Sequence, residues 1–321
     1  MQKIYRFPIL GIAIFVVLFG TSRLSGFQIH VESALVTVPV IVSDLQGRFI
    51  PELKADDFRL FHDGAPEKIS LFLASDEPFK IALLLDTSMS TTTVLGKIQK
   101  AARRFLLQMR PNDLAMVVSF DSEVRVLCPL SSDRRELEKA IETAETRGSG
   151  TKLRDAILQI QNRFRSFSGR KAIVLLTDGD DHGSVVKAPE LRDAVLSSGT
   201  LIYSIFYSID YRELMKELGA PPRMPSSSRK VQETNAIWAE QERKSSLYLQ
   251  DLAELSAGRF YRSKVTEFDQ AFKQISDELH SQYLIGFYPD RSKLDGNLHS
   301  LSVQVNLPGV TVRSRPNYKS Q

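Results

Sequence analysis

The sequence is poor in cysteine: Cys128 is the only one among 321 residues, so no disulfide bond can form within the chain. A protein of this length buries enough apolar surface to fold without such cross-links, and the lack of disulfides is therefore compatible with export. Cys128 lies in a strand-like run, which favours a small buried side chain over a reactive thiol.

An excess of one charge is also lacking. The chain has 42 lysines and arginines against 38 acidic residues, for a net charge of +4, and its basic residues form no block. A mixed surface of this kind gives no indication of nucleic-acid binding. The histidines are scattered without a His-x-x-x-His or His/Cys spacing, which argues against a zinc site. These histidines are His30, His62, His182, His280 and His299.

Long apolar runs are rare, and the one that stands out lies at the N-terminus. Lys3 and Arg6 precede an uncharged run that begins at Phe7, and the small residue Ser22 follows it. This order is typical of a secretory signal, and the span of 16 residues is short for a membrane-spanning helix. We expect residues 1–22 to be a cleaved signal peptide, with a retained membrane anchor as the alternative. In both cases the protein is exported, to the periplasm or outside the cell.

Strand and helix patterns alternate between residues 79 and 282, which predicts an α/β domain with a doubly wound, mostly parallel sheet of about six strands. The strand at 124–127 is expected to be antiparallel, because only a short turn separates it from the strand before it. Residues 209–245 interrupt this rhythm, with a helix expected around Trp238. This insertion either carries specificity or is a tolerated surface segment.

Two β-rich segments flank the α/β domain, an N-terminal module at 23–78 and a C-terminal segment at 283–321. Each is small for an independent hydrophobic core. We therefore expect the two segments to pair into one β-sandwich. Within the first, Asp63 and Gly64 are expected to form a hairpin turn.

Oxygen-bearing side chains are expected at the carboxyl edge of the predicted sheet, where α/β proteins bind ligands. Asp86, Ser88 and Ser90 follow the apolar strand that begins at residue 80, and Thr151 and Asp178 lie in two later loops at the same edge. Two carboxylates and three hydroxyls are hard oxygen ligands, which suit Mg²⁺ better than zinc.

Three motifs carry a resemblance to a known family: Asp86-Thr-Ser-Met-Ser90, Gly150-Thr-Lys-Leu-Arg-Asp-Ala156 and Thr177-Asp-Gly179. Their order and spacing resemble the loops of a von Willebrand factor type A domain with a metal-ion-dependent adhesion site. The flanking β segments resemble those of bacterial exported proteins related to this family. The resemblance covers about residues 79–282.

The resemblance implies a divalent metal, Mg²⁺ with Mn²⁺ or Ca²⁺ as alternatives, and a protein partner that presents a carboxylate to it. It implies that Ser88 and Ser90 bind the metal directly, that Thr151 does so directly or through water, and that Asp86 and Asp178 act mainly through water. Met89 stands where glycine is common and is expected to narrow access without preventing metal binding.

Four polar residues next to these motifs have two interpretations each. Asp155 is either an outer carboxylate of the metal site or a brace for its loop. Asp180, Asp181 and His182 either line the rim of the site or are solvated loop residues.

These features predict a metal-dependent protein-binding module and no catalytic residue. A structural component of an envelope complex, with an incidental metal, is the first alternative. A phosphotransfer or hydrolase enzyme with Asp86 as nucleophile is the second, but a second acid and a general base are missing. No Gly-x-Gly-x-x-Gly motif follows the first strand of the α/β domain, which argues against dinucleotide binding.

Overall fold

The computed structural model describes residues 35–208 and 229–320. Its largest sheet has six strands in the order β10-β9-β8-β5-β6-β7, all parallel except for the antiparallel pair β6 and β7. The strands are β5 (Phe79–Asp86), β6 (Leu114–Phe120), β7 (Val124–Ser131), β8 (Arg170–Thr177), β9 (Leu201–Phe206) and β10 (Arg259–Arg262). This confirms the expected doubly wound α/β fold, including the antiparallel strand.

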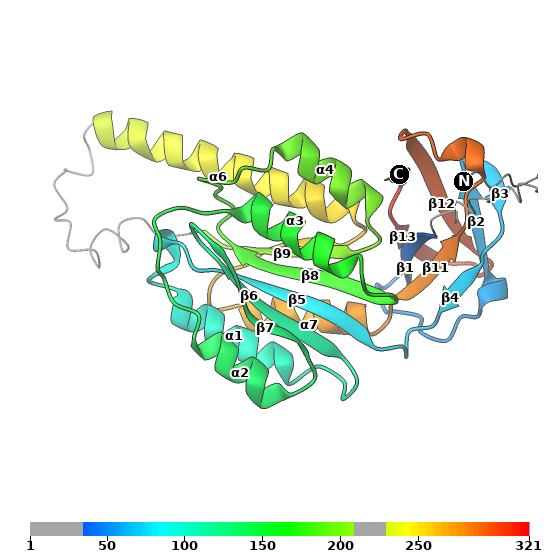
Figure 1. Ribbon diagram of the computed structural model, residues 1–321, viewed down its shortest axis with the longest axis horizontal. Helices are drawn as coiled ribbons and strands as arrows, with labels where there is room; N and C mark the ends of the chain where they lie inside the picture. The colour runs from blue at the N-terminus through cyan, green and yellow to red at the C-terminus, as the bar shows by residue number, and fades with distance from the viewer. Residues whose placement is uncertain (1–34, 209–228, 321) are drawn as a thin grey trace, which may run out of the picture. The chain divides into compact units, whose positions relative to one another are not determined.

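Helices cover both faces of this sheet (Figure 1). Alternate residues of β5 divide between two cores: Ile81 and Leu83 pack toward α1, α2 and α7, whereas Ala82 and Leu84 pack toward α3, α4 and α6. The helices are α1 (Leu95–Leu106), α2 (Arg134–Glu142), α3 (Leu153–Phe164), α4 (Ala188–Ser197), α6 (Arg229–Leu255) and α7 (Phe268–Leu279). Burial on both faces explains why the residues of β5 from Ile81 to Leu85 are all apolar.

The helix expected around Trp238 is part of one long helix, α6, which continues to Leu255. No glycine or proline occurs between Arg229 and Leu255, so nothing in the backbone ends the helix. Its C-terminal part packs on the sheet through Leu249 and Leu252, which are fully buried. The rest of the expected insertion, residues 209–228, lies outside the described residues, as does the expected signal peptide. Within the described ranges, no helix is long and apolar enough to cross a membrane.

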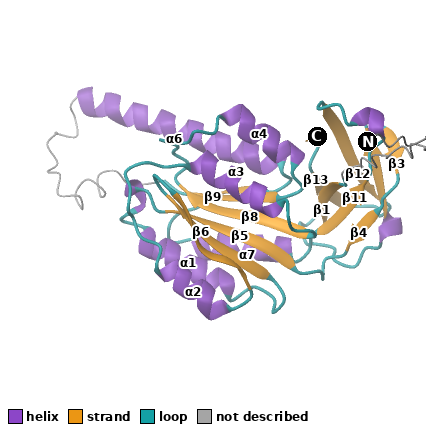
Figure 2. Cartoon of the chain, in the orientation of Figure 1, coloured by secondary structure: helices purple, strands orange, loops and turns teal. Residues whose placement is uncertain are grey.

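Two four-stranded sheets combine the N- and C-terminal segments (Figure 2). The first has the order β13-β1-β11-β4 and the second β14-β12-β2-β3, and side chains from both share one core. The strands are β1 (Val36–Asp44), β2 (Phe58–His62), β3 (Ala65–Glu67), β4 (Leu71–Leu73), β11 (Tyr283–Phe287), β12 (Leu298–Val305), β13 (Val310–Ser314) and β14 (Asn317–Lys319). The predicted β-sandwich is confirmed.

A buried arginine joins this sandwich to the α/β sheet. Arg170, the first residue of β8, donates hydrogen bonds to the carbonyls of Ala74 (3.1 Å), Glu77 (2.9 Å) and Leu279. Its guanidinium lies 3.8 Å from the ring centre of Phe79, the first residue of β5. The sandwich is therefore attached at the amino ends of the central strands, away from the edge where Asp86 lies.

Candidate metal centre

The carboxyl ends of β5 and β8 bring the first and third predicted loops together. Asp86 is the last residue of β5 and Thr177 the last residue of β8, and the two strands are paired in parallel. The chain leaves β5 into the short 3-10 helix η2 (Met89–Thr91), which carries Ser90, and leaves β8 directly into Asp178. Adjacent parallel strands thus deliver both polar loops to one edge.

Hydrogen bonds connect four of the five predicted ligands. Ser88 Oγ donates to Asp86 Oδ1 at 2.6 Å, and Ser90 Oγ donates to Asp178 Oδ2 at 2.6 Å. Thr177 Oγ1 donates to Asp86 Oδ2, also at 2.6 Å, so both oxygens of this carboxylate are held. The two loops are therefore held in place around the carboxylates by contacts within the protein itself.

The two serine oxygens lie side by side. Ser88 Oγ and Ser90 Oγ are 3.1 Å apart. A hydroxyl has one proton to donate, and the shorter contacts with Asp86 and Asp178 take both protons. With the protons directed to the carboxylates, both hydroxyl oxygens keep lone pairs that a cation can bind.

These distances fit a small divalent cation. Neighbouring ligands of an octahedral ion are separated by √2 times the metal–oxygen distance, which is about 2.9 Å for Mg²⁺. The two oxygens expected to bind the ion directly, Ser88 Oγ and Ser90 Oγ, are 3.1 Å apart, which is close to this separation. All the donors are hard oxygens, so the residues present fit a divalent ion of the Mg²⁺ class.

The second loop is placed by its backbone. The amide of Thr151 donates to the carbonyl of His182 at 3.2 Å, which brings it beside the loop that follows Asp178. A side chain at Gly150 would meet that same carbonyl at 3.0 Å, and one at Gly148 would collide with Ser122. The glycines therefore allow the close approach that leaves Thr151 only 4% exposed at this edge.

The electrostatics of the site favour a cation. Burial and the charge of Asp178 together raise the pKa of Asp86 to about 8, although the hydrogen bonds from Ser88 and Thr177 act to lower it. Burial also raises the pKa of Asp178, despite the hydrogen bond from Ser90. The positive charge of Arg125 does not offset these acids, because Arg125 forms its ion pair with a different carboxylate, Asp121. Two buried acids that share one site are costly to ionise unless positive charge joins them.

The neighbouring polar residues mostly brace the loops. Asp155 accepts hydrogen bonds from the backbone amides of Val185 (3.2 Å) and Val186 (2.9 Å), which is the bracing alternative. Asp181 accepts one from the amide of Arg154 at 3.0 Å. Met89 is 44% exposed beside the predicted ligands.

Helix α6 also contacts this edge, which the sequence reasoning missed. Gln241 Nε2 and Ser245 Oγ donate to Asp180 Oδ1 at 3.1 and 3.2 Å. Asp180 lies two residues beyond Asp178, so α6 buttresses the third loop. The three residues have no distinctive spacing, and the contact follows only from how α6 packs.

Residues 81–180 match the family model of the von Willebrand factor type A domain. No curated protein sequence matches the chain. Among solved structures, BatB from Bacteroides thetaiotaomicron is 18% identical, with a TM-score of 0.44 over 63% of this chain and 97% of BatB. A von Willebrand factor type A protein from Catenulispora acidiphila is 12% identical, with a TM-score of 0.47 over 83% of this chain and 74% of its own.

Proximal thread matrix protein 1 from the mussel byssus, with a zinc-occupied metal-ion-dependent adhesion motif, is 15% identical, with a TM-score of 0.44 over 63% of this chain and 48% of its own. At this level of similarity, the solved structures carry no argument about the site. The match of residues 81–180 includes the three loops that carry Asp86, Thr151 and Asp178.

Proposed function

We propose that this chain is an exported protein whose von Willebrand factor type A domain mediates protein–protein binding that depends on a divalent cation. The observation that carries the proposal is the pair of serine oxygens, Ser88 Oγ and Ser90 Oγ, which lie 3.1 Å apart while each hydroxyl donates its proton to a buried carboxylate. The residues proposed to hold the cation are Asp86, Ser88, Ser90, Thr151 and Asp178.

Each residue has a distinct part in this proposal. Ser88 and Ser90 present lone pairs, while Asp86 and Asp178 accept their protons and supply the negative charge. Thr177 holds Asp86 in place. When bound, the cation supplies an open coordination position for a carboxylate of the partner protein. Mg²⁺ is the proposed ion, with Mn²⁺ or Ca²⁺ as alternatives, because every donor is a hard oxygen.

The proposal includes the organisation of the whole chain. Residues 1–22 serve as a signal peptide, with a membrane anchor as the alternative, and the mature protein acts in the periplasm or outside the cell. The β segments at 23–78 and 283–321 form a support for the type A domain at 79–282. Arg170 supports this division, because it ties the sandwich to the sheet at the end away from Asp86.

An interaction module agrees better with the site than an enzyme does. Type A domains are typically interaction modules, and Asp86 is fully buried with both carboxylate oxygens hydrogen-bonded, to Ser88 and Thr177. A nucleophile needs an accessible lone pair and a neighbouring base. The other alternative, an envelope component with an incidental metal, differs in its prediction that partner binding does not depend on the cation.

Calorimetric titration with Mg²⁺ tests the proposal. We expect the wild-type protein to bind one ion and Asp86→Ala to bind none, because the variant removes the carboxylate that accepts the proton of Ser88. Ser302→Ala is the control, because Ser302 is exposed on β12 in the sandwich. Equal Mg²⁺ binding by wild type and Asp86→Ala would contradict the proposal.

A further inference from the structure

A second cluster of metal-ligating side chains lies in the β-sandwich, far along the chain from the type A loops. His62 ends β2 and His299 lies in the paired strand β12. In both strands alternate residues face the core, and both histidines fall on the inward positions. Asp63 follows His62 in a tight turn with positive φ (50°), which Gly64 continues (78°). Strand pairing thus brings the three residues together.

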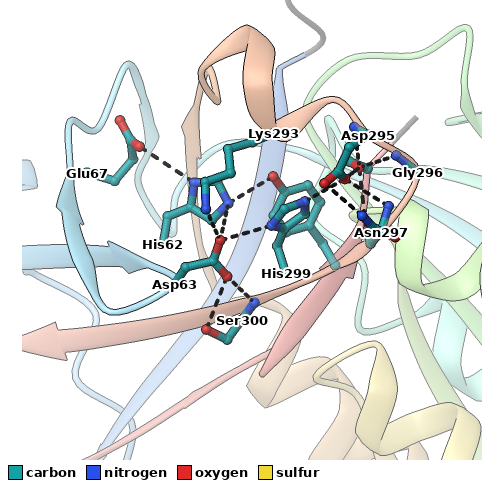
Figure 3. A network of polar contacts seen from close by, with 11 residues as sticks. His62, Asp63, Glu67, Lys293, Asp295, Gly296, Asn297, His299 and Ser300 are labelled. Atoms are coloured by element: carbon teal, nitrogen blue, oxygen red, sulfur yellow. Dashed lines mark hydrogen bonds and ion pairs between the residues drawn. The ribbon is translucent and has the colours of Figure 1, made fainter.

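The ligand atoms of the three residues converge. His299 Nδ1 lies 2.9 Å from Asp63 Oδ2, and His62 Nε2 lies 3.7 Å from the same oxygen. One ligand atom from each residue lies within 4.8 Å of the other two (Figure 3). The two rings are 5.2 Å apart at an angle of 70°, so they meet edge to face instead of stacking.

Each imidazole also has a carboxylate beside its other nitrogen. His299 Nε2 is 2.9 Å from Asp295 Oδ1, and His62 Nδ1 is 3.7 Å from Glu67 Oε2 (Figure 3). Histidines that bind metals commonly carry an outer carboxylate in this way, which orients the ring and makes it a better ligand. The histidines of this cluster therefore have both an inner and an outer carboxylate.

The carboxylate of Asp63 already forms an ion pair with Lys293. Lys293 Nζ is 2.5 Å from Asp63 Oδ2, and its side chain is 40% exposed, so it can withdraw into solvent. Tyr318 Oη is 3.1 Å from His62 Nε2 and is a second group that a metal would displace. The cluster holds three carboxylates, of Asp63, Glu67 and Asp295, against the one ammonium of Lys293. With neutral imidazoles, that leaves a net negative charge for a divalent ion to neutralise.

We propose that His62, Asp63 and His299 form a second metal site, specific for zinc-class ions, which ties the N-terminal β segment to the C-terminal one. Two imidazole nitrogens and one carboxylate oxygen are the donor set that zinc prefers over Mg²⁺. The metal takes the place of the Lys293 ammonium, and water completes its coordination. Since the ligands are separated by most of the chain, the ion binds the folded state and stabilises it.

The experiment is a calorimetric titration of the full-length chain with ZnCl₂. It is carried out on Asp86→Ala, so that the proposed site in the type A domain does not contribute and the two proposals fail independently. We expect this protein to bind one zinc ion. Adding His62→Gln or His299→Gln should lower the zinc affinity by more than about 100-fold, because loss of an outer partner of a ligand already costs about 10–100-fold. His280→Gln is the matched control, because His280 also faces a carboxylate, Asp113 at 3.0 Å, but lies outside the cluster.

Lys293→Met is a second variant, which tests the site without changing a proposed ligand and can be used if a histidine variant fails to fold. Removal of the competing ammonium should tighten zinc binding by about 10-fold or more, and X-ray absorption at the zinc edge should show two imidazole ligands. Zinc binding that is absent, that survives both histidine substitutions, or that is unchanged or weaker in Lys293→Met would overturn the proposal.

Discussion

Ser90 Oγ donates a 2.6 Å hydrogen bond to Asp178 Oδ2, which joins the loop after β5 to the loop after β8. This contact determines how the Ser90 hydroxyl can interact with a cation. It uses the only proton of Ser90, and with the equivalent bond from Ser88 to Asp86 it leaves two hydroxyl oxygens facing each other. The buried acids on either side explain why a cation is expected between these loops.

Asp86→Asn is expected to make the metal-free protein more stable while it abolishes stabilisation by Mg²⁺. The amide replaces a buried carboxyl whose pKa is raised to about 8, and such a group costs folding free energy at neutral pH because it is ionised in the unfolded chain. Thermal unfolding with and without Mg²⁺ measures both effects. If the metal-free variant is less stable than wild type, or if Mg²⁺ stabilises both proteins equally, the prediction is wrong and Asp86 is not a residue of a Mg²⁺ site.

Asp121→Asn is expected to lower the free energy of unfolding at pH 7 by about 1–3 kcal/mol. Although burial acts to raise its pKa, hydrogen bonds from Arg125 and from the amide of Glu123 hold the pKa of Asp121 below its usual value of 3.8. A depressed carboxyl pKa contributes stability that is present above about pH 4 and is lost as the pH falls through the folded-state pKa.

Urea unfolding of wild type and Asp121→Asn at a series of pH values checks this sign. The difference between the two proteins should be constant from pH 5 to 7 and should shrink toward pH 2. A difference that is constant over the whole range would mean that the asparagine acts through packing and not through lost charge.

Arg170→Leu is expected to destabilise the protein without weakening Mg²⁺ binding. The substitution leaves the carbonyls of Ala74, Glu77 and Leu279 without this donor, and the loss at the buried carbonyl of Leu279 alone costs about 1–3 kcal/mol. The arginine begins β8, whereas the candidate site lies at the other end of that strand. Chemical unfolding gives the first quantity and calorimetry the second; a parallel loss of Mg²⁺ affinity would show that the two ends are coupled.

The central sheet and its polar edge could be predicted because their signals are local. The apolar run before Asp86 is continuous along the chain, and the Asp-x-Ser-x-Ser spacing fits one turn at its end. Parallel strand pairing then brings Asp178 to Ser90. The position of Thr151 also depends on glycines that the sequence displays.

The contacts that the sequence did not reveal are those between distant elements. His62 and His299 are far apart in the sequence and show no metal-binding spacing, because their proximity depends on the register of β2 against β12. The bonds from Gln241 and Ser245 to Asp180 depend on how α6 lies against the sheet. No local pattern encodes either arrangement, since both result from tertiary packing.

The most direct test of the central claim is the relaxation of water protons by Mn²⁺ bound to the wild-type chain, measured as acetate is added. If the cation keeps an open position for a carboxylate, acetate displaces a coordinated water and the relaxation enhancement falls, while Ser90→Ala shows no enhancement at the same Mn²⁺ concentration. An enhancement that acetate leaves unchanged, or that is equal in Ser90→Ala, would contradict a carboxylate-binding metal site at this edge of the sheet.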